Sequence, residues 1–160
     1  EPLYDRFLKL GIGPGVVEAK IITGQRAAAE LIWAGVPQRY PNLRVIIAEG
    51  GIGWIPSLVG FMDHWWTDHR RWMEPTLDEK PSFYFNRQFW ATFEEDRAGV
   101  ILAREGLLNP DRIMWGSDYP HTEGTFPYSR EAITRDFAGI PEALVHKIVV
   151  SNAAELYDLK

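Results

Sequence analysis

The chain has 160 residues, of which 46% are hydrophobic and 13% aromatic, so we expect one globular unit with a buried core rather than a disordered segment. It contains no cysteine, which excludes disulfides, thiolate zinc sites and cysteine nucleophiles. Acidic and basic residues are well mixed at a net charge of -5, and this argues against a nucleic-acid partner.

The first residue and the hydropathy of the chain indicate whether it is a piece of a longer protein and where that protein is located. The chain begins with Glu1 and its first methionine is Met62, so we expect a processed chain or a piece of a longer protein. No apolar run approaches the roughly 20 residues that span a bilayer, and no secretory signal opens the sequence. A cytoplasmic protein without a membrane partner is therefore predicted.

The first part of the chain predicts a loop, a helix, a strand and a second helix. Residues 1–25 contain several glycines and are predicted as a loop-rich lead-in. Apolar residues at helical spacing predict a helix over residues 26–36, which Gly35 and Pro37 end. Residues 43–48 form a β-branched run too short for a helix, so a buried strand is predicted there. Apolar positions over residues 52–66 lie on one helical face and predict the next helix.

The same alternation continues to the end of the chain. The predicted elements are a strand at residues 89–93, a helix at 97–105, a strand at 113–115, a helix that begins at Ser129, and helices at 141–150 and 153–159. Parallel strands need crossover connections, which are usually helical, so this order predicts an α/β fold with about three parallel strands and flanking helices. Three units do not close an eight-stranded barrel, which typically takes about 250 residues. The chain is therefore either an incomplete barrel or a small layered domain.

A carboxylate follows each predicted strand. Glu49 follows the first strand, residues 94–96 follow the second, and Asp118 follows the third together with His121. The carboxyl ends of parallel strands meet at one edge of a sheet, so these side chains are expected to converge. Carboxylates and an imidazole there suit metal-assisted chemistry, and no nucleotide-binding fingerprint or serine nucleophile elbow competes with this interpretation.

Each of these side chains has a functional and a structural interpretation. Asp118 could bind a divalent ion or take a proton from a metal-bound water, or it could only cap the turn before Tyr119. His121 is a candidate ligand, proton donor or support for Asp118. Glu49 precedes two glycines, which fits a pocket position, but an acid there could also serve as the N-cap of the following helix.

Several segments resemble a known family. They are Tyr40-Pro-Asn-Leu-Arg-Val-Ile-Ile-Ala-Glu-Gly-Gly51, Lys80-Pro-Ser-Phe-Tyr-Phe85 with Ala91-Thr-Phe-Glu-Glu-Asp96, Asp111-Arg-Ile-Met-Trp-Gly-Ser-Asp-Tyr-Pro-His121, and Ser151-Asn-Ala-Ala-Glu-Leu-Tyr157. Together they resemble the carboxyl-terminal portion of the amidohydrolase-related family, which contains aminocarboxymuconate-semialdehyde decarboxylase and similar metal-dependent decarboxylases and hydrolases. The resemblance covers residues 26–159.

The resemblance implies that residues 1–160 are part of a metal-dependent (β/α)8 TIM barrel, with residues 26–160 as its last βα units and terminal helices. Strands that end at Ala48, Phe93 and Trp115 would be the sixth, seventh and eighth. Asp118 would match the last-strand aspartate that binds the metal and transfers protons. The family's His-x-His pair and fifth-strand histidine would lie before residue 1. The implied cofactor is a divalent metal ion, with zinc preferred.

Glu49 departs from the decarboxylases of this group, which carry a catalytic histidine at the corresponding position. Some relatives carry the same Ala-Glu-Gly-Gly form, so the resemblance places the chain in a subgroup. A carboxylate at position 49 would repel a substrate carboxylate that a protonated histidine would attract. Glu49 therefore favours hydrolysis relative to decarboxylation.

The expected function is that of a fragment of a metal-dependent hydrolase or carboxy-lyase that acts on a small organic, cyclic or aromatic substrate. Asp118 would hold the metal or transfer a proton, Glu49 would act as acid, base or substrate anchor, and His121 would support Asp118. The alternative is a non-catalytic fragment or interaction module that keeps barrel packing without a complete metal site.

Aromatic side chains offer candidate contacts to substrate and to other subunits. Four of them are candidate pocket walls, although each could be a core residue: Trp54, Trp115, Tyr119 and Phe126. Tryptophans 65, 66 and 72 are expected to be core or oligomer contacts, which leaves a homo-oligomer open.

Overall fold

Three short parallel strands form the centre of the molecule, which is described here by a computed structural model covering residues 15–74, 76–121 and 124–159. The strands are β1 (Val45–Ile47), β2 (Phe89–Phe93) and β3 (Ile113–Trp115), in the order β1-β2-β3. Val45 lies opposite Phe89, and Ala91 lies opposite Ile113. The predicted α/β class with about three parallel strands and flanking helices is therefore confirmed.

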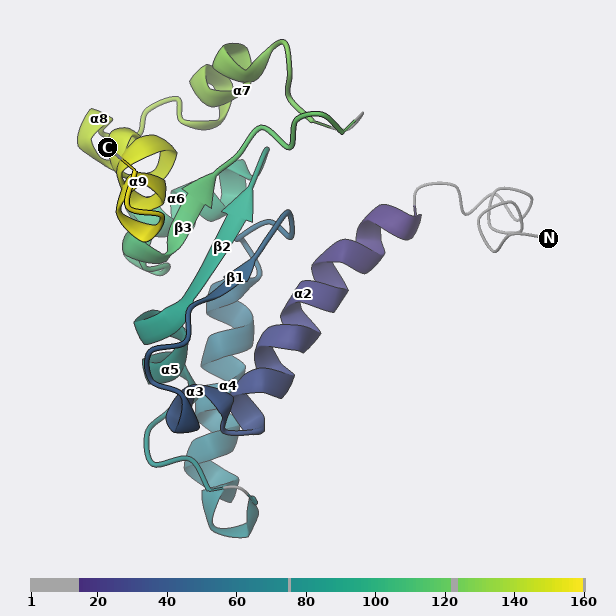
Figure 1. Ribbon diagram of the computed structural model, residues 1–160, viewed down its shortest axis with the longest axis vertical. Helices are drawn as coiled ribbons and strands as arrows, with labels where there is room; N and C mark the ends of the chain where they lie inside the picture. The colour runs from purple at the N-terminus through teal and green to yellow at the C-terminus, as the bar shows by residue number, and fades with distance from the viewer. Residues whose placement is uncertain (1–14, 75, 122–123, 160) are drawn as a thin grey trace, which may run out of the picture.

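Helices connect and cover these strands (Figure 1). They are α2 (Gly15–Trp33), α3 (Val36–Arg39), α4 (Ile55–His69), α5 (Pro81–Gln88), α6 (Arg97–Arg104), α7 (Ser129–Asp136), α8 (Glu142–His146) and α9 (Asn152–Leu156). Two 3-10 turns, η1 (Arg70–Trp72) and η2 (Pro110–Arg112), and one π-helical turn, η3 (Lys147–Ser151), complete the described elements. No helix among the described residues is long and apolar enough to cross a membrane.

Both faces of the sheet are apolar. Side chains alternate along a strand, so one set points toward the helices and joins the main core: Ile47, Phe89, Ala91, Phe93 and Ile113. The other set forms a second cluster with Leu156 of α9: Ile46, Trp90 and Met114. A sheet that is apolar on both faces is typical of parallel sheets in barrels and layered α/β folds.

Helix α2 begins earlier than predicted. The expected loop-rich segment up to residue 25 is wrong for residues 15–25, which are helical, while residues 1–14 lie outside the described part. Gly24 lies inside the helix, where a Cβ atom would come within 2.8 Å of Cγ2 of Ile47. Glycine here permits close packing of α2 on β1, and the sequence pattern alone does not distinguish this role from a loop. The helix ends before Gly35, which takes a φ of 67°.

Helix α5 is not predicted by the sequence pattern. It begins with Pro81 after an extended Lys80, and Ser82 donates its backbone N–H to Oδ1 of Asp63 on α4 at 2.8 Å. The group that caps α5 therefore comes from another helix. Because this partner lies 19 residues away in sequence, no local capping motif marks the start of the helix.

The last helices are held against β3 by a buried asparagine. The two helices predicted at residues 141–150 and 153–159 form one run from α8 through η3 to α9. Nδ2 of Asn152 donates to the carbonyl oxygens of Pro110 at 2.6 Å and Ile113 at 2.7 Å. These bonds fix the start of α9 to the beginning of β3, and Ala153 and Leu156 of α9 pack in the second apolar cluster of the sheet.

Candidate metal centre at the carboxyl ends of the strands

Three predicted side chains come together beyond the carboxyl ends of the strands. Glu49 follows β1, and Asp118 and His121 follow β3. Each offers one possible ligand atom, and these atoms all lie within 4.8 Å of one another. β2 lies between the two strands that supply them, so the sheet order brings the three residues into one group.

The carboxylate of Asp118 has the environment of a metal ligand. Its side chain is only 3% exposed, and Oδ1 lies 2.7 Å from Nδ1 of His121. Oδ2 is buried and finds no hydrogen-bond partner within the described part of the chain. Leaving a buried carboxylate oxygen unpaired is costly, and a bound cation would remove that cost. Two carboxylates and an imidazole also form a suitable donor set for a divalent ion.

Both carboxylates are carried on unusual backbone. Glu49 has a φ of 58° and Asp118 a φ of 54°, and both angles lie in the left-handed region that side chains other than glycine disfavour. Such a conformation costs about 1–2 kcal/mol per residue and is concentrated at functional sites. Asp158 near the carboxyl terminus shares it with a φ of 53°, so the angle supports a site only together with the convergence of the side chains.

Thr92 fixes the position of Glu49. The backbone N–H of Glu49 donates to Oγ1 of Thr92 on β2 at 2.9 Å. Alternation along β2 places Thr92 on the same face as Trp90, away from the helix-side core. Thr92 is not among the residues predicted from the sequence, although the two-residue period of a strand predicted at residues 89–93 could have identified it.

The loop after β3 closes on itself and places His121 beside Asp118. The backbone N–H of Thr125 donates to the carbonyl oxygen of Ser117 at 2.9 Å, and that of His121 donates to the carbonyl oxygen of Asp118 at 2.8 Å. Gly124 passes close to this segment, because a Cβ atom there would lie 2.7 Å from the Ser117 oxygen. Glycine at position 124 is therefore required for the loop to hold its shape.

The aspartate after β2 supports the rim of the site. Oδ2 of Asp96 accepts the backbone N–H groups of Ile52 and Gly53, both at 2.7 Å, and Oδ1 accepts that of Gly99 at 2.8 Å. One carboxylate thus caps α6 and ties it to the loop that carries Glu49. This is a structural role for a residue that could have been a ligand by sequence alone.

Glu95 belongs to a separate ion-pair network. Its Oε1 lies 2.6 Å from Nη2 of Arg135 on α7, and Nε of the same arginine lies 2.8 Å from Oδ1 of Asp136. Hydrogen bonds to Asp136 and then to Glu95 raise the pKa of Arg135 above its ordinary value. The network joins the loop after β2 to α7, so Glu95 stabilises the surroundings of the site.

The two tryptophans predicted to line the pocket, Trp54 and Trp115, lie on the helix side of the sheet. Nε1 of Trp54 donates to the carbonyl oxygens of Gly50 and Gly51, and its ring meets Phe85 edge-on at 6.2 Å. Nε1 of Trp115 donates to the carbonyl oxygen of Glu94 at 2.7 Å. Both rings pack against the main core, which favours the interpretation that they are core residues.

Tyr119 and Phe126 lie in the loop that carries Asp118. Their rings are 66% and 65% exposed and meet edge-on with centroids 5.0 Å apart. Tyr119 lies between the possible ligands Asp118 and His121 in the sequence, and Phe126 follows them. The role of the pair as a substrate wall stays a prediction.

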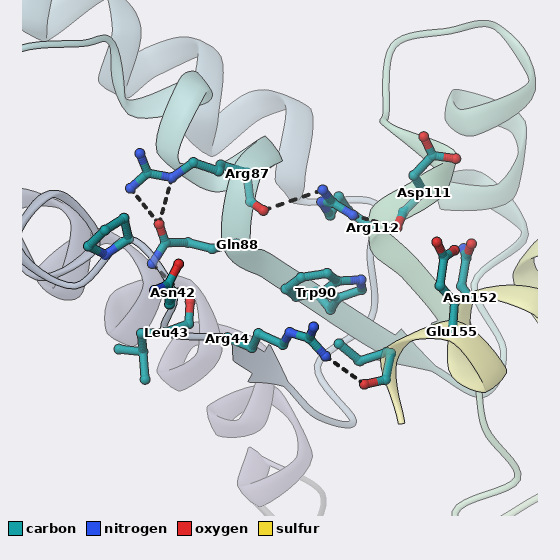
Figure 2. A pocket seen from close by; sticks show the side chains of 12 residues that line it. Asn42, Leu43, Arg44, Arg87, Gln88, Trp90, Asp111, Arg112, Asn152 and Glu155 are labelled. Carbon is teal, nitrogen blue, oxygen red and sulfur yellow. Dashed lines mark hydrogen bonds between the residues drawn. The ribbon is translucent and has the colours of Figure 1, made fainter. Parts of the chain in front are cut away.

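A cavity of about 500 Å³ lies at the opposite, amino ends of the strands (Figure 2). Its arginines bind within the protein: Arg44 Nη1 donates to the Leu156 carbonyl at 2.9 Å, and Arg112 Nη2 donates to the Arg87 carbonyl at 3.3 Å. Arg112 also stacks over Trp90, 4.5 Å from the ring centroid. The amino-terminal face of such folds serves stability, so the candidate site is the group at the carboxyl ends despite the size of this cavity.

The chain is similar to several known decarboxylases and amidohydrolases. Among curated proteins, the decarboxylase yanB of Aspergillus niger is 27% identical over 99 residues, which cover 60% of this chain and 26% of that protein. Among solved structures, 5-carboxyvanillate decarboxylase LigW from Sphingomonas paucimobilis is 27% identical with a TM-score of 0.67, covering 81% of this chain and 38% of its own. The amidohydrolase map2389c from Mycobacterium avium subsp. paratuberculosis is 27% identical with a TM-score of 0.68, covering 82% and 32%.

A further structure supports the fold alone. The dihydroxybenzoic acid decarboxylase from Polaromonas sp. JS666, which holds manganese and the inhibitor 2-nitroresorcinol, is 24% identical with a TM-score of 0.62. The chain spans 26–40% of the length of these four relatives and corresponds to part of their amidohydrolase barrel. The sequence model of the amidohydrolase family matches residues 15–159. The chain therefore belongs to the amidohydrolase family.

Proposed function

We propose that this chain forms part of a metal-dependent carboxy-lyase that removes a carboxyl group from a small aromatic acid. The observation that carries the proposal is the convergence of Glu49, Asp118 and His121, with Oδ2 of Asp118 buried and unpaired among the described residues. The decarboxylase names of two relatives at 27% identity support the reaction class. A non-catalytic fragment is not favoured, because it would have no use for this costly arrangement.

Glu49 and Asp118 are the side chains that would hold the metal, and His121 would orient Asp118. A divalent ion bound there would supply Lewis acidity and offset the charge of the two carboxylates. Zinc remains the first candidate. Manganese is the second, because oxygen atoms dominate the donor set and carboxylates suit that ion.

The pair formed by Asp118 and His121 is suited to proton transfer. Asp118 engages Nδ1 of His121, so Nε2 is the ring atom at which a proton would be exchanged with substrate. The His121 side chain is 56% exposed, which places it at the entrance rather than in the core. In a decarboxylation the bond between the ring carbon and the carboxyl carbon breaks, carbon dioxide leaves, and His121 would deliver the proton that replaces it.

Tyr119 and Phe126 would contact the substrate ring. Two exposed aromatic side chains in the same loop as Asp118 offer the edge and face contacts that an aromatic acid would use. Trp54 and Trp115, predicted for the same purpose, would instead support the loops from the helix side.

Hydrolysis is the second candidate, and Glu49 is the observation that favours it. A carboxylate in this position could activate water, and it would repel a substrate carboxylate unless the metal offsets its charge. The two reactions are therefore distinguished by the substrate and not by the ligand set.

The test is an assay of the full-length protein against aromatic carboxylates, including 5-carboxyvanillate and dihydroxybenzoic acids, and against esters and amides of similar size. We expect release of carbon dioxide that stops after chelation and returns when zinc or manganese is added. Metal-dependent cleavage of esters or amides alone would establish the hydrolase instead. Turnover that survives chelation would contradict both.

A further inference from the structure

The segment at the end of β2 contacts both loops that carry the candidate metal ligands. We call residues 92–96 the β2-end segment. The loop after β1, residues 48–54, is the first arm and carries Glu49; the loop after β3, residues 116–121 and 124–128, is the second arm and carries Asp118. β2 lies between β1 and β3 in the sheet. The separation of the two carboxylates therefore depends on how the β2-end segment holds each arm.

Thr92 and Asp96 hold the first arm through its backbone. Oγ1 of Thr92 accepts the N–H of Glu49 at 2.9 Å. Oδ2 of Asp96 accepts the N–H groups of Ile52 and Gly53, both at 2.7 Å. Hydrogen bonds to a charged acceptor are short and strong, so this carboxylate fixes the position and direction of both N–H groups. The first arm is thus held on both sides of the two glycines that follow Glu49.

Glycine residues in the first arm leave room for the carboxylate of Asp96. A Cβ atom at Gly51 would lie 3.2 Å from its Oδ2, and one at Gly53 would lie 3.3 Å from its Oδ1. Both distances are shorter than ordinary van der Waals contacts. The first arm therefore fits closely around this side chain, which indicates a specific contact in addition to the capping of α6.

Backbone carbonyl groups of the β2-end segment hold the start of the second arm. The carbonyl oxygen of Phe93 accepts the N–H of Gly116 at 2.9 Å. The carbonyl oxygen of Glu94 accepts Nε1 of Trp115 at 2.7 Å. Gly116 lies two residues before Asp118, so these bonds fix the point at which the second arm leaves β3.

Glu95 holds the other end of the second arm. Its Oε1 lies 2.6 Å from Nη2 of Arg135 on α7, the helix that follows this arm. A cavity of about 300 Å³ lies beside the ion pair, and Thr125 and Phe126 of the second arm line it together with Glu95 and Arg135. Because the described side chains leave this space open, the connection between the β2-end segment and this side of α7 relies on the ion pair.

We propose that Asp96 and Glu95 are positioning residues that set the separation of Glu49 and Asp118, and thereby the affinity of the site for its divalent ion. The two side chains are adjacent in sequence and hold different arms, Asp96 the first and Glu95 the second. A metal ion needs ligand atoms within about 0.2 Å of its preferred distances, so a small shift of either arm weakens binding. The inference rests on the proposed function, because it concerns the same metal site.

Two substitutions separate the effect of Asp96 on the first arm from its role as the N-cap of α6. Asp96→Ser keeps an oxygen that can accept the N–H of Gly99, but it loses the second oxygen, which holds the first arm. Asp96→Ala loses both. In calorimetric titration of zinc into the metal-free full-length protein, both variants should bind about 10–100-fold more weakly than the wild type. Asp96→Ser should melt at a higher temperature than Asp96→Ala, because it keeps the cap.

Glu95→Gln tests the second arm at a position where the protein should fold normally, since this side chain is 52% exposed. We expect zinc affinity to fall by about 3–10-fold, less than for Asp96, because an exposed ion pair is a weaker connection. The electron paramagnetic resonance spectrum of bound manganese should also change in shape, because it depends on the arrangement of the ligands. Glu105→Gln is the matched control: it breaks a Glu–Arg pair of 2.7 Å with Arg104 at the end of α6 and should change neither quantity.

The wild-type titration separates this inference from the proposed function. A wild type that binds no divalent ion would overturn both. If the wild type binds zinc and Asp96→Ser binds it equally well, Asp96 only caps α6 and its positioning role is overturned. An unchanged zinc affinity and manganese spectrum in Glu95→Gln would overturn the role of Glu95 in the same way, because the ligands would then keep their arrangement without the ion pair.

Discussion

Asp118 combines two features that are unfavourable on their own. Its backbone is left-handed, and its buried carboxylate leaves Oδ2 unpaired within the described part of the chain. Each feature lowers the stability of a protein that lacks a ligand, and a cation between Glu49 and Asp118 would offset the second. Stability and function therefore oppose each other at this residue, and a single substitution can separate them.

Asp118→Asn removes the charge and keeps the size. We expect the full-length protein to lose its bound metal and its turnover to fall by at least about 100-fold, more than the loss of a group that only supports a ligand. The melting temperature without metal should stay the same or rise, because a neutral amide replaces a buried carboxylate whose Oδ2 has no partner among the described residues. Metal analysis and melting curves check this. Asp158→Asn, at an exposed aspartate with the same backbone angle, should change neither quantity.

Thr92 offers a second test at the level of single residues. Thr92→Val removes the acceptor of the Glu49 N–H bond, which should lower stability by about 1–3 kcal/mol and weaken metal binding. Thr92→Ser keeps the hydroxyl group and should restore metal affinity. Calorimetric titration of zinc into the metal-free full-length variants measures both. Equal affinity in the valine and serine variants would show that the hydroxyl does not position Glu49.

Helix α6 packs closely against the loop after β1. A Cβ atom at Gly99 would lie 2.3 Å from Cγ1 of Ile52 and 2.9 Å from the Gly53 nitrogen. Asp96 binds the same loop through its carboxylate. The position of Glu49 thus depends on a contact between two helix starts that are distant in sequence.

Gly99→Ala should destabilise the protein by about 1–3 kcal/mol, because the added methyl group meets both the buried Ile52 side chain and the backbone of Gly53. Gly60→Ala is the matched control. A Cβ atom at Gly60 on α4 meets nothing within 4 Å, so alanine there should stabilise the helix by up to about 1 kcal/mol. Chemical denaturation of the two variants gives the comparison. A loss of stability in both would point to a requirement for flexibility rather than to a steric clash.

The strands and their order of connection could be predicted from local patterns. β2 and β3 lie where the aromatic and apolar runs predicted, and β1 lies within the predicted residues 43–48. Glu49, Asp118 and His121 could also be predicted to converge, because carboxyl ends of parallel strands share one edge. These predictions succeed because a β-branched or apolar run and the end of a strand are properties of short segments.

Other features could not be predicted because they arise from contacts between distant segments. Glycine at position 24 is typical of a loop. Only the close approach of the Ile47 side chain explains a glycine inside α2. The start of α5 is capped by Asp63 from another helix. Tryptophan is a residue type that often lines pockets, so Trp54 and Trp115 could be predicted as pocket walls. Only the structure shows that both pack against the main core.

At the scale of the whole molecule, the sheet formed by the described strands has two unpaired edges. Neither β1 nor β3 has a second partner among the described strands, and the chain spans 32–40% of its structural relatives. Exposed edges promote association. We expect the 160-residue chain, produced alone, to form mixed aggregates and to bind zinc at least about tenfold more weakly than the full-length protein. Light scattering and zinc titration of both forms check this, and a uniform species with equal affinity would contradict it.

The closed loop after β3 contains residues with a fixed backbone and residues with exposed side chains. Backbone contacts among Ser117, Gly124 and Thr125 close the loop. The exposed side chains of Tyr119 and Phe126 project outward from it. Replacing the outward rings therefore disturbs neither the closure nor the ligand group. Under the proposed function, changes at these two positions would alter the substrate preference, and a library randomised there would be a practical starting point for directed evolution.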